Sequence, residues 1–266
     1  MITMPFFQVD AFAGRPFEGN PAAVIPLDQW LPDEMLQSIA AENNLSETAF
    51  TVPSASVEAD YDLRWFTPTV EVDLCGHATL ASAHILLKDS HIRFATRSGV
   101  LSVAREEGKL WLDLPAYAVE EGEEPGLVAA LGVAGPSFLG RGGNGAAIVL
   151  LDDEAAVLGV TPDFAALRGI DRLVMVTAPG KSTAIVSRVF AAFHGIDEDP
   201  VTGSAHAALV PFWAPRLGSD SFSASQASRR TGHLDCRLSR GSGVDGADRV
   251  RLGGTAVTVI EGQFRL

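Results

Sequence analysis

The sequence predicts an α+β protein made of two similar domains, each a mostly antiparallel sheet rolled around one central helix. Three observations predict this fold. Segments of the first half recur in the second, many short apolar segments are rich in β-branched and aromatic residues, and each half has one helix-like segment that is apolar on nearly every face. A chain of 266 residues is long enough for two modest domains.

The internal repeat is the strongest of these observations. Three segments return in the same order: "GNPAAV" (19–24) as "GNGAAI" (143–148), "FTPTVEVDLCGHATLA" (66–81) as "FHGIDEDPVTGSAHAA" (193–208), and "RSGVLSV" (97–103) as "RTGHLDC" (230–236). The second match needs no gap and aligns Gly76 with Gly203. We therefore predict a duplicated chain with halves at residues 1–118 and 119–266, in which the final strands can cross back to the first half.

The first half contains most of the predicted strands. They lie at residues 6–12, 22–27, 47–53, 61–68, 99–105 and 110–115. Residues 32–43, "PDEMLQSIAAEN", predict a helix because Pro and two acidic residues occupy the first turn. Residues 77–87 are nearly all small or apolar, which predicts a helix buried on most faces.

The second half repeats this layout. Strands are predicted at residues 146–151, 173–179 and 185–193, and the matching buried helix at residues 204–213. Pro211 lies inside that helix and predicts a kink or an early end there. The acidic stretch "EEGEEPG", residues 120–126, is the predicted linker. The glycine-rich "GRGGNG" (140–145) precedes a strand rather than a helix, so we predict a turn and no dinucleotide site. "PGKST" (179–183), between two strands, predicts a hairpin turn.

The charge balance restricts the partners. With 33 acidic and 20 basic residues the net charge is −13, which repels nucleic acid and anionic lipid. No segment approaches the roughly 20 apolar residues of a membrane helix, and the N-terminus does not resemble a signal peptide. Cys75 and Cys236 are the two cysteines and provide no disulfide framework. We expect a cytoplasmic protein without nucleic acid or membrane partners.

The stretch "LCGHATLASAHIL" combines Cys75, Gly76 and His77 at the head of the first buried helix. A structural zinc site requires four ligands at recognisable spacing, and the distant Cys236 does not supply them, so we predict no metal. A Cys75–His77 dyad is harder to exclude, but side chains this close in sequence seldom meet. A helix start accounts for most of these residues.

Gly76 and Gly203 occupy equivalent helix starts. Without a Cβ, each lets a bound group approach the backbone, and the N–H groups that follow have no intrahelical partner. The two helix starts are predicted to bind the ends of a small carboxylic acid. Two ordinary helix starts with small residues for close packing remain the alternative.

Two acidic residues next to these features are candidates for chemistry. Glu47, in "NLSETAFTV", stands at the start of a strand, and Asp199, in "DEDPVTGSAH", precedes the second helix start. For Glu47 the sequence alone favours a capping or solvent-facing carboxylate, and only partial burial would make it suit proton transfer. For Asp199 an acid that caps the loop or the helix start is equally plausible.

Four segments resemble the phenazine-biosynthesis PhzF-like family: "VDAFAGRPFEGNPAAVI", "NLSETAF", "RWFTPTVEVDLCGHATLASAHIL" and "GIDEDPVTGSAHAALVPFW". "QASRRTGHL" (226–234) is similar to a motif of its MAWD-binding-protein-like branch, with Thr231 where that branch has Gly. The resemblance implies a diaminopimelate-epimerase-like fold with the active site between two domains. It also implies isomerase chemistry without cofactor or metal, with Glu47 as the general acid/base, completed by His77, Asp199 and Ser204. Asn20, Gly76, His77, Gly203 and Ser204 are the corresponding substrate-binding positions.

The resemblance leaves two alternatives. Thiol epimerases and proline racemases of this fold carry one cysteine directly before each glycine, whereas this chain has Cys75 and Thr202. A hydroxyproline-type dehydratase or epimerase using Cys75 is the first alternative, although a Thr202 hydroxyl without an adjacent base is too weak an acid and base for proton transfer. A catalytically idle binding protein is the second. The expected partner is a small carboxylate-bearing molecule. A homodimer is the oligomeric state that we consider for this chain.

Overall fold

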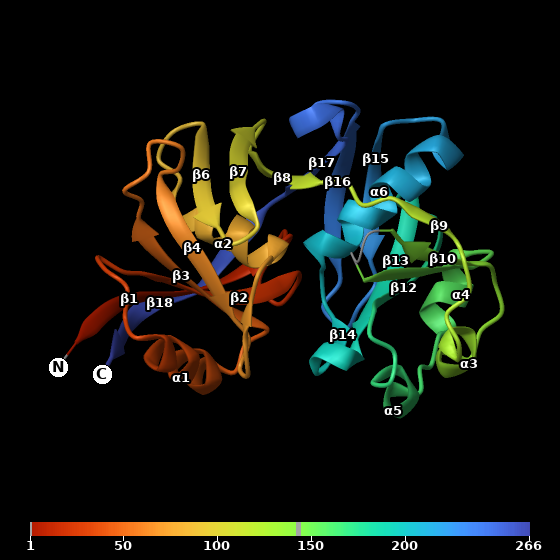
Figure 1. The fold of residues 1–266 in the computed structure, drawn as a ribbon, viewed down its shortest axis with the longest axis horizontal. Coiled ribbons are helices and arrows are strands. Elements are labelled where there is room, and N and C mark those ends of the chain that lie inside the picture. The colour runs from red at the N-terminus through yellow and green to blue at the C-terminus, as the bar shows by residue number, and fades with distance from the viewer. Residues whose placement is uncertain (1, 142–144) are drawn as a thin grey trace. The chain divides into compact units, whose positions relative to one another are not determined.

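The computed structural model describes residues 2–141 and 145–266, and these form two compact units. Unit 1 contains residues 2–113 and 253–266, and unit 2 contains residues 114–252. Both units consist of strands around a central helix, which confirms the predicted α+β fold (Figure 1). Residues 142–144 belong to the predicted "GRGGNG" turn and to the "GNGAAI" repeat, so these two predictions lie partly outside the described residues.

Unit 1 is a curved, mostly antiparallel sheet. Its strands are β1 (Thr3–Ala11), β2 (Asn20–Pro26), β3 (Glu47–Pro53), β4 (Tyr61–Phe66), β5 (Glu71–Val72), β6 (His91–Thr96), β7 (Gly99–Glu106), β8 (Lys109–Pro115) and β18 (Ala256–Arg265). The spatial order is β18–β1–β2–β3–β4–β6–β7–β8, in which the β2–β3 and β4–β6 pairs are parallel and the others antiparallel. The short β5 pairs with β4.

Helix α2 (Gly76–Leu86) is the centre of unit 1. It lies within the curve of the sheet and packs against β1, β2, β3 and β18 (Figure 1). Its first eight residues are all buried. Small side chains allow this because strands can approach the helix closely, so the helix predicted at residues 77–87 is confirmed to within one residue. Helix α1 (Asp33–Asn43) instead covers the other face of the sheet, where Leu36 and Ile39 pack with Phe50 of β3.

Unit 2 repeats the strand order of unit 1. Its strands are β9 (Val119–Glu121), β10 (Ser137–Gly140), β11 (Ala146–Leu150), β12 (Leu173–Pro179), β13 (Ile185–Ala191), β14 (Ile196–Asp199), β15 (Ser221–Gln226), β16 (Gly232–Ser239) and β17 (Arg249–Gly254). The order β9–β10–β11–β12–β13–β15–β16 has the same succession of parallel and antiparallel pairs as β18–β1–β2–β3–β4–β6–β7. The antiparallel β12–β13 pair also confirms the turn predicted at "PGKST".

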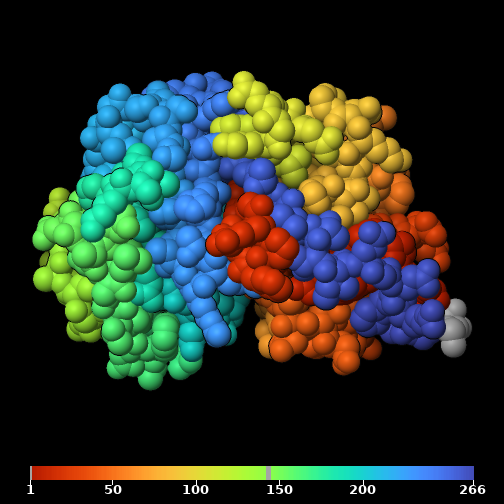
Figure 2. Space-filling view, turned by 180° about the vertical axis from the view of Figure 1, so that it is seen from behind, coloured from red at the N-terminus to blue at the C-terminus, as the bar shows by residue number. Residues whose placement is uncertain are grey.

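Strands β9 and β18 hold equivalent places in the two units. The first residues of the predicted linker belong to β9, which pairs with β10 as β18 pairs with β1. Both chain ends therefore lie together in unit 1 (Figures 1 and 2). On the opposite face to helix α6 (Gly203–Leu217), the short helices α3 (Leu127–Leu131), α4 (Glu154–Gly159) and α5 (Phe164–Leu167) cover an apolar cluster that includes Val176, Val186 and Phe190. The remaining helical turns are the 3₁₀ segments η1 (Ala192–His194) and η2 (Val244–Gly246).

Helix α6 (Gly203–Leu217) is the central helix of unit 2 and corrects one prediction. It continues for 15 residues through both Pro211 and Pro215, so an early end at Pro211 was wrong. Proline lacks the N–H that would bond the carbonyl four residues earlier, which is that of Ala207. The N–H of Tyr117 donates to this carbonyl at 2.9 Å instead, so the helix can continue without leaving a buried oxygen unsatisfied.

Across the described residues, none of the helices has the length and apolar composition needed to cross a lipid bilayer.

Candidate functional site

Three predicted site residues of unit 1 meet at one edge of its sheet. Asn20 is the first residue of β2 and Glu47 the first of β3. Because β2 and β3 are parallel, with Ala22 opposite Glu47, both strands begin at the same edge. The buried start of α2 packs against the same two strands and adds His77, its second residue.

Glu47 and His77 form the central contact of this site. Their Oε2 and Nε2 atoms are 3.1 Å apart, and their side chains are 12% and 4% exposed. The distance between the two atoms is that of an ion pair, but their alignment is not that of a hydrogen bond. A carboxylate and an imidazole in contact, shielded from water, can share and transfer a proton.

The other ring nitrogen of His77 faces the side chain of Asn20. Asn20 Nδ2 lies 3.2 Å from His77 Nδ1, and Ser46 Oγ donates to Asn20 Oδ1 at 3.2 Å. Asn20 is completely buried. The amide can serve both forms of the ring, because its NH₂ suits an unprotonated Nδ1 and its oxygen, after a flip, suits a protonated one. The Ser46 hydroxyl can donate or accept accordingly.

Cys75 also contacts His77, which sequence spacing disfavoured. Cys75 Sγ is 3.6 Å from His77 Nδ1. The expectation that these side chains do not meet was wrong, because Cys75 has an extended backbone (φ −141°, ψ 110°) before the helix and its side chain is directed back over the first turn. Burial raises the pKa of the Cys75 thiol, and the charge of Glu47 raises it further.

His77 is the titrating group in this cluster. Burial alone would lower its pKa, but the neighbouring Cys75 and Glu47 more than offset burial and hold the pKa of His77 well above its ordinary value. Since the Cys75 thiol itself is difficult to ionise, we attribute the increase in the pKa of His77 mainly to Glu47.

Glu47, Cys75 and His77 present ligand atoms within 4.8 Å of one another, close enough for a cation to be considered. The carboxylate, however, lies against Nε2 and the thiol against Nδ1 of the same ring. A metal ion binds one imidazole nitrogen, so these two donors do not converge on a common point in this arrangement.

Unit 2 brings together the other predicted site residues. Asp199 ends β14, and Gly203 and Ser204 begin α6 directly after Thr202. Asp199 is 8% exposed and Ser204 is half-buried. Thr202 Oγ1 donates to Asp199 Oδ2 at 2.5 Å, so the prediction that the Thr202 hydroxyl has no adjacent base was wrong. The aspartate reaches this hydroxyl because only two residues separate them at the turn from β14 into α6.

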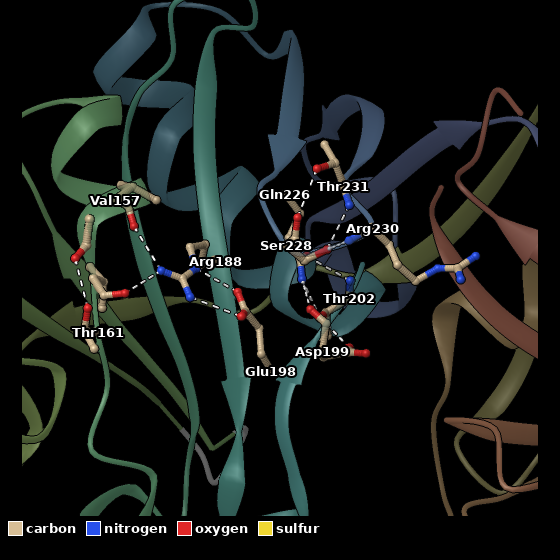
Figure 3. Close-up of polar contacts among 12 residues, drawn as sticks. Val157, Thr161, Arg188, Glu198, Asp199, Thr202, Gln226, Ser228, Arg230 and Thr231 are labelled. Atoms are coloured by element: carbon tan, nitrogen blue, oxygen red, sulfur yellow. Dashed lines mark hydrogen bonds and ion pairs between the residues drawn. The ribbon is translucent and has the colours of Figure 1, made fainter. Parts of the chain in front are cut away.

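Sequence reasoning missed Gln226 as a functional candidate. This completely buried residue ends β15 and accepts a hydrogen bond from the N–H of Thr202 at 2.9 Å (Figure 3). Gln226 is the first residue of the "QASRRTGHL" motif, so a signal was present in the sequence. In the same motif Thr231 has a φ of 57°, the left-handed region that favours glycine, which explains the glycine expected there.

The fold and these two helix starts define a class: a duplicated α+β protein with buried acid/base residues beside a helix N-terminus. The family model for "Phenazine biosynthesis-like protein" (PhzC-PhzF) matches residues 9–262, and the chain belongs to this family. An uncharacterized isomerase of Pseudomonas aeruginosa is 50% identical, over 99% of each chain.

Two solved structures extend the comparison. A PhzF-family phenazine biosynthesis protein of Enterococcus faecalis has a TM-score of 0.89 and 44% identity, and covers 100% of both chains. A hydroxyproline epimerase of Agrobacterium vitis has a TM-score of 0.64 and 14% identity, over 98% of this chain and 91% of its own. At this identity the second likeness concerns the fold alone, and it confirms the epimerase-like architecture.

Proposed function

We propose that the protein is a cofactor-independent isomerase that moves a proton within a small carboxylate-bearing substrate. The observation that carries the proposal is the buried contact between Glu47 Oε2 and His77 Nε2, at 3.1 Å. The names of the related proteins support the same reaction class, since the Pseudomonas aeruginosa relative is called an isomerase.

Glu47 acts as the base and then as the acid. Its carboxylate takes a proton from a substrate carbon, which leaves an enolate-like anion, and the resulting carboxylic acid returns the proton to another carbon. The substrate gains and loses one proton, so no electron carrier is needed. His77 contacts the Glu47 carboxylate and orients it, and Asn20 holds the His77 ring through Nδ1.

The helix starts bind the substrate carboxylate in this proposal. The first N–H groups of α2 and α6 are donors without intrahelical partners at the positive ends of their helices. Donors fixed in place stabilise negative charge that develops during the reaction. Asp199 and Ser204 complete the set of proposed site residues. An anion bound to the protein is expected against the backbone at Gly76 or Gly203, and an anion found only on the outer surface would count against these roles.

Thiol chemistry is the less favoured alternative. Because burial raises the pKa of Cys75, the thiolate that an epimerase or dehydratase would use is difficult to form. The idle binding protein is the other alternative, and it predicts no turnover at all.

Incubation with small amino and hydroxy acids in heavy water tests the proposal. Deuterium uptake at carbon is expected for at least one compound, and Glu47→Gln should lower that rate by about 100-fold or more while the protein stays folded. The matched control is Glu42→Gln, which makes the same chemical change at an exposed residue of α1 and should retain full activity. Full activity in Glu47→Gln would refute the assignment of the base, and exchange in none of the compounds would favour a binding role.

A further inference from the structure

Both polar atoms of the Gln226 carboxamide form hydrogen bonds with the segment that precedes α6. Its Oε1 accepts from the N–H of Thr202 at 2.9 Å. Its Nε2 donates to the carbonyl oxygen of Asp199 at 2.6 Å and to Thr202 Oγ1 at 3.1 Å (Figure 3). The reversed amide would place two oxygens 2.6 Å apart and an NH₂ against an N–H, so only one orientation satisfies these contacts.

This orientation also fixes the proton of the Thr202 hydroxyl. Because Thr202 Oγ1 accepts from Gln226, its own proton is free to donate to Asp199 Oδ2, 2.5 Å away. One side chain thus holds the main chain at residues 199 and 202 and, through the hydroxyl, the carboxylate of Asp199. Four connected hydrogen bonds in a buried setting restrict this carboxylate to a narrow range of positions.

The carboxamide is attached to a rigid part of unit 2. Gln226 pairs with Ser187 of β13 and Gly232 of β16, and the next residue, Ala227, donates its N–H to the Ser187 carbonyl at 2.7 Å. The contact therefore ties the start of α6 to the sheet. At the aligned position of unit 1, Cys75 contacts His77, so the two helix starts carry different side-chain arrangements.

We propose that Gln226 is a positioning residue, which holds the Asp199 carboxylate and the first N–H groups of α6 in the orientation that the reaction requires. The catalytic part of this inference rests on the proposed isomerase function. The geometric part, that Gln226 orders the segment from Asp199 to Ser204, does not depend on it.

The test compares four variants with the wild-type protein. Gln226→Met keeps the length of the side chain and removes all three contacts, Thr202→Val removes the hydroxyl, and Thr202→Ser restores it. The control is Thr177→Val, which removes the hydrogen bond from Trp213 Nε1 at 3.0 Å and so weakens α6 away from its first turn. A merely structural role for Gln226 predicts that Gln226→Met and Thr177→Val behave alike.

The first measurement, amide hydrogen exchange, needs no substrate. Exchange at the Thr202 N–H should become about 10-fold faster or more in Gln226→Met relative to Thr177→Val at matched stability. A crystal structure of Gln226→Met should show the Asp199 carboxylate displaced or in several orientations. Unchanged exchange together with an unchanged Asp199 would overturn the positioning role whatever the enzyme does.

The second measurement uses a compound that the wild-type protein labels with deuterium. We expect kcat to fall by about 10-fold or more in Gln226→Met and Thr202→Val, because small displacements of catalytic groups are costly. Thr202→Ser and Thr177→Val should stay within about 3-fold. A fifth variant that combines Gln226→Met with Thr202→Val should lose little more than the worse of these two single variants. Wild-type kcat in Gln226→Met would overturn the inference and leave the proposed function intact. Absence of labelling in the wild type would instead overturn the proposed function, and hydrogen exchange would still decide the geometry.

Discussion

Replacement of His206 with Asn should flatten the dependence of the protein's stability on pH below neutrality. His206 is completely buried in the first turn of α6. Its Nδ1 lies 2.9 Å from the carbonyl oxygen of Thr202, so Nδ1 carries the ring proton, and Nε2 is buried without a hydrogen-bond partner among the described residues. Burial lowers the pKa of His206 from 6.5 to about 4, although the bond to Thr202 acts in the opposite direction.

The sign of the effect follows from these two pKa values. The unfolded chain takes up a proton on His206 near pH 6.5, whereas the folded protein does so only near pH 4. The contribution of this histidine to stability is therefore complete above pH 6.5, declines as the pH falls, and is lost below about 4. The difference corresponds to about 3 kcal/mol of unfolding free energy. His77 does not mask this decline, because a raised pKa gives a contribution that is complete below pH 6.5 and is lost only at higher pH.

Urea unfolding between about pH 4.5 and about pH 7.5 measures this contribution, because the range covers most of the interval between the protonation of His206 in the unfolded chain and in the folded protein. Asn at position 206 keeps an N–H group for the Thr202 carbonyl and removes the titration. The difference in unfolding free energy between the wild type and His206→Asn should then change by about 2 to 3 kcal/mol across this range. The control, His233→Gln, removes an exposed histidine of β16 and should follow the wild type. Parallel pH profiles for the wild type and His206→Asn would refute the reasoning.

Further predictions concern the thiol and the packing of one glycine. Cys75→Ala and Cys75→Ser should retain most of the deuterium-exchange activity that Glu47→Gln loses, and a thiol alkylator should inhibit slowly, because burial raises the pKa of the thiol. Loss of turnover in folded Cys75→Ala would favour the dehydratase or epimerase alternative. Gly254→Ala should lower the unfolding free energy by about 1 to 3 kcal/mol, because its Cβ would lie 2.5 Å from Phe12 Cδ1. Gly262→Ala has no neighbouring atom within 4 Å and should stay within about 0.5 kcal/mol of the wild type in the same denaturation assay.

The sequence predicted the fold because the signals for it are local or repeated. Apolar character over residues 77–87 is sufficient to predict a buried helix, and α2 spans Gly76–Leu86. Aligned glycines predicted two equivalent helix starts, which the matching strand orders of the two units support. The early end predicted at Pro211 was wrong because the hydrogen bond that compensates for this proline comes from Tyr117, a residue about 90 positions away that no local pattern connects to it.

The candidate site was harder to predict because its contacts depend on backbone direction. The Cys75–His77 contact follows from the extended conformation of Cys75, which spacing does not reveal. Asn20 and Glu47 meet because two parallel strands begin at one edge, so their partnership with His77 required the sheet order. Gln226 reaches Thr202 from another strand, and its motif alone did not indicate which residue it would bind.

The two helix starts show how a duplicated unit can keep one backbone and carry different side-chain contacts. In unit 1, Thr79 Oγ1 donates to the carbonyl of Cys75 at 2.5 Å; in unit 2, Nδ1 of the aligned His206 lies 2.9 Å from the carbonyl of Thr202. Both side chains thus fix the peptide that precedes the first glycine and keep the following N–H groups directed outward. What differs is the residue before the glycine and its neighbours. The buried Glu47–His77 pair beside Cys75 suits proton transfer, whereas a Thr202 hydroxyl held by Gln226 suits the placement of Asp199. In the proposed function, the shared backbone places donor N–H groups at both helix starts, and the divergence of the flanking side chains is the reason to assign the base to unit 1.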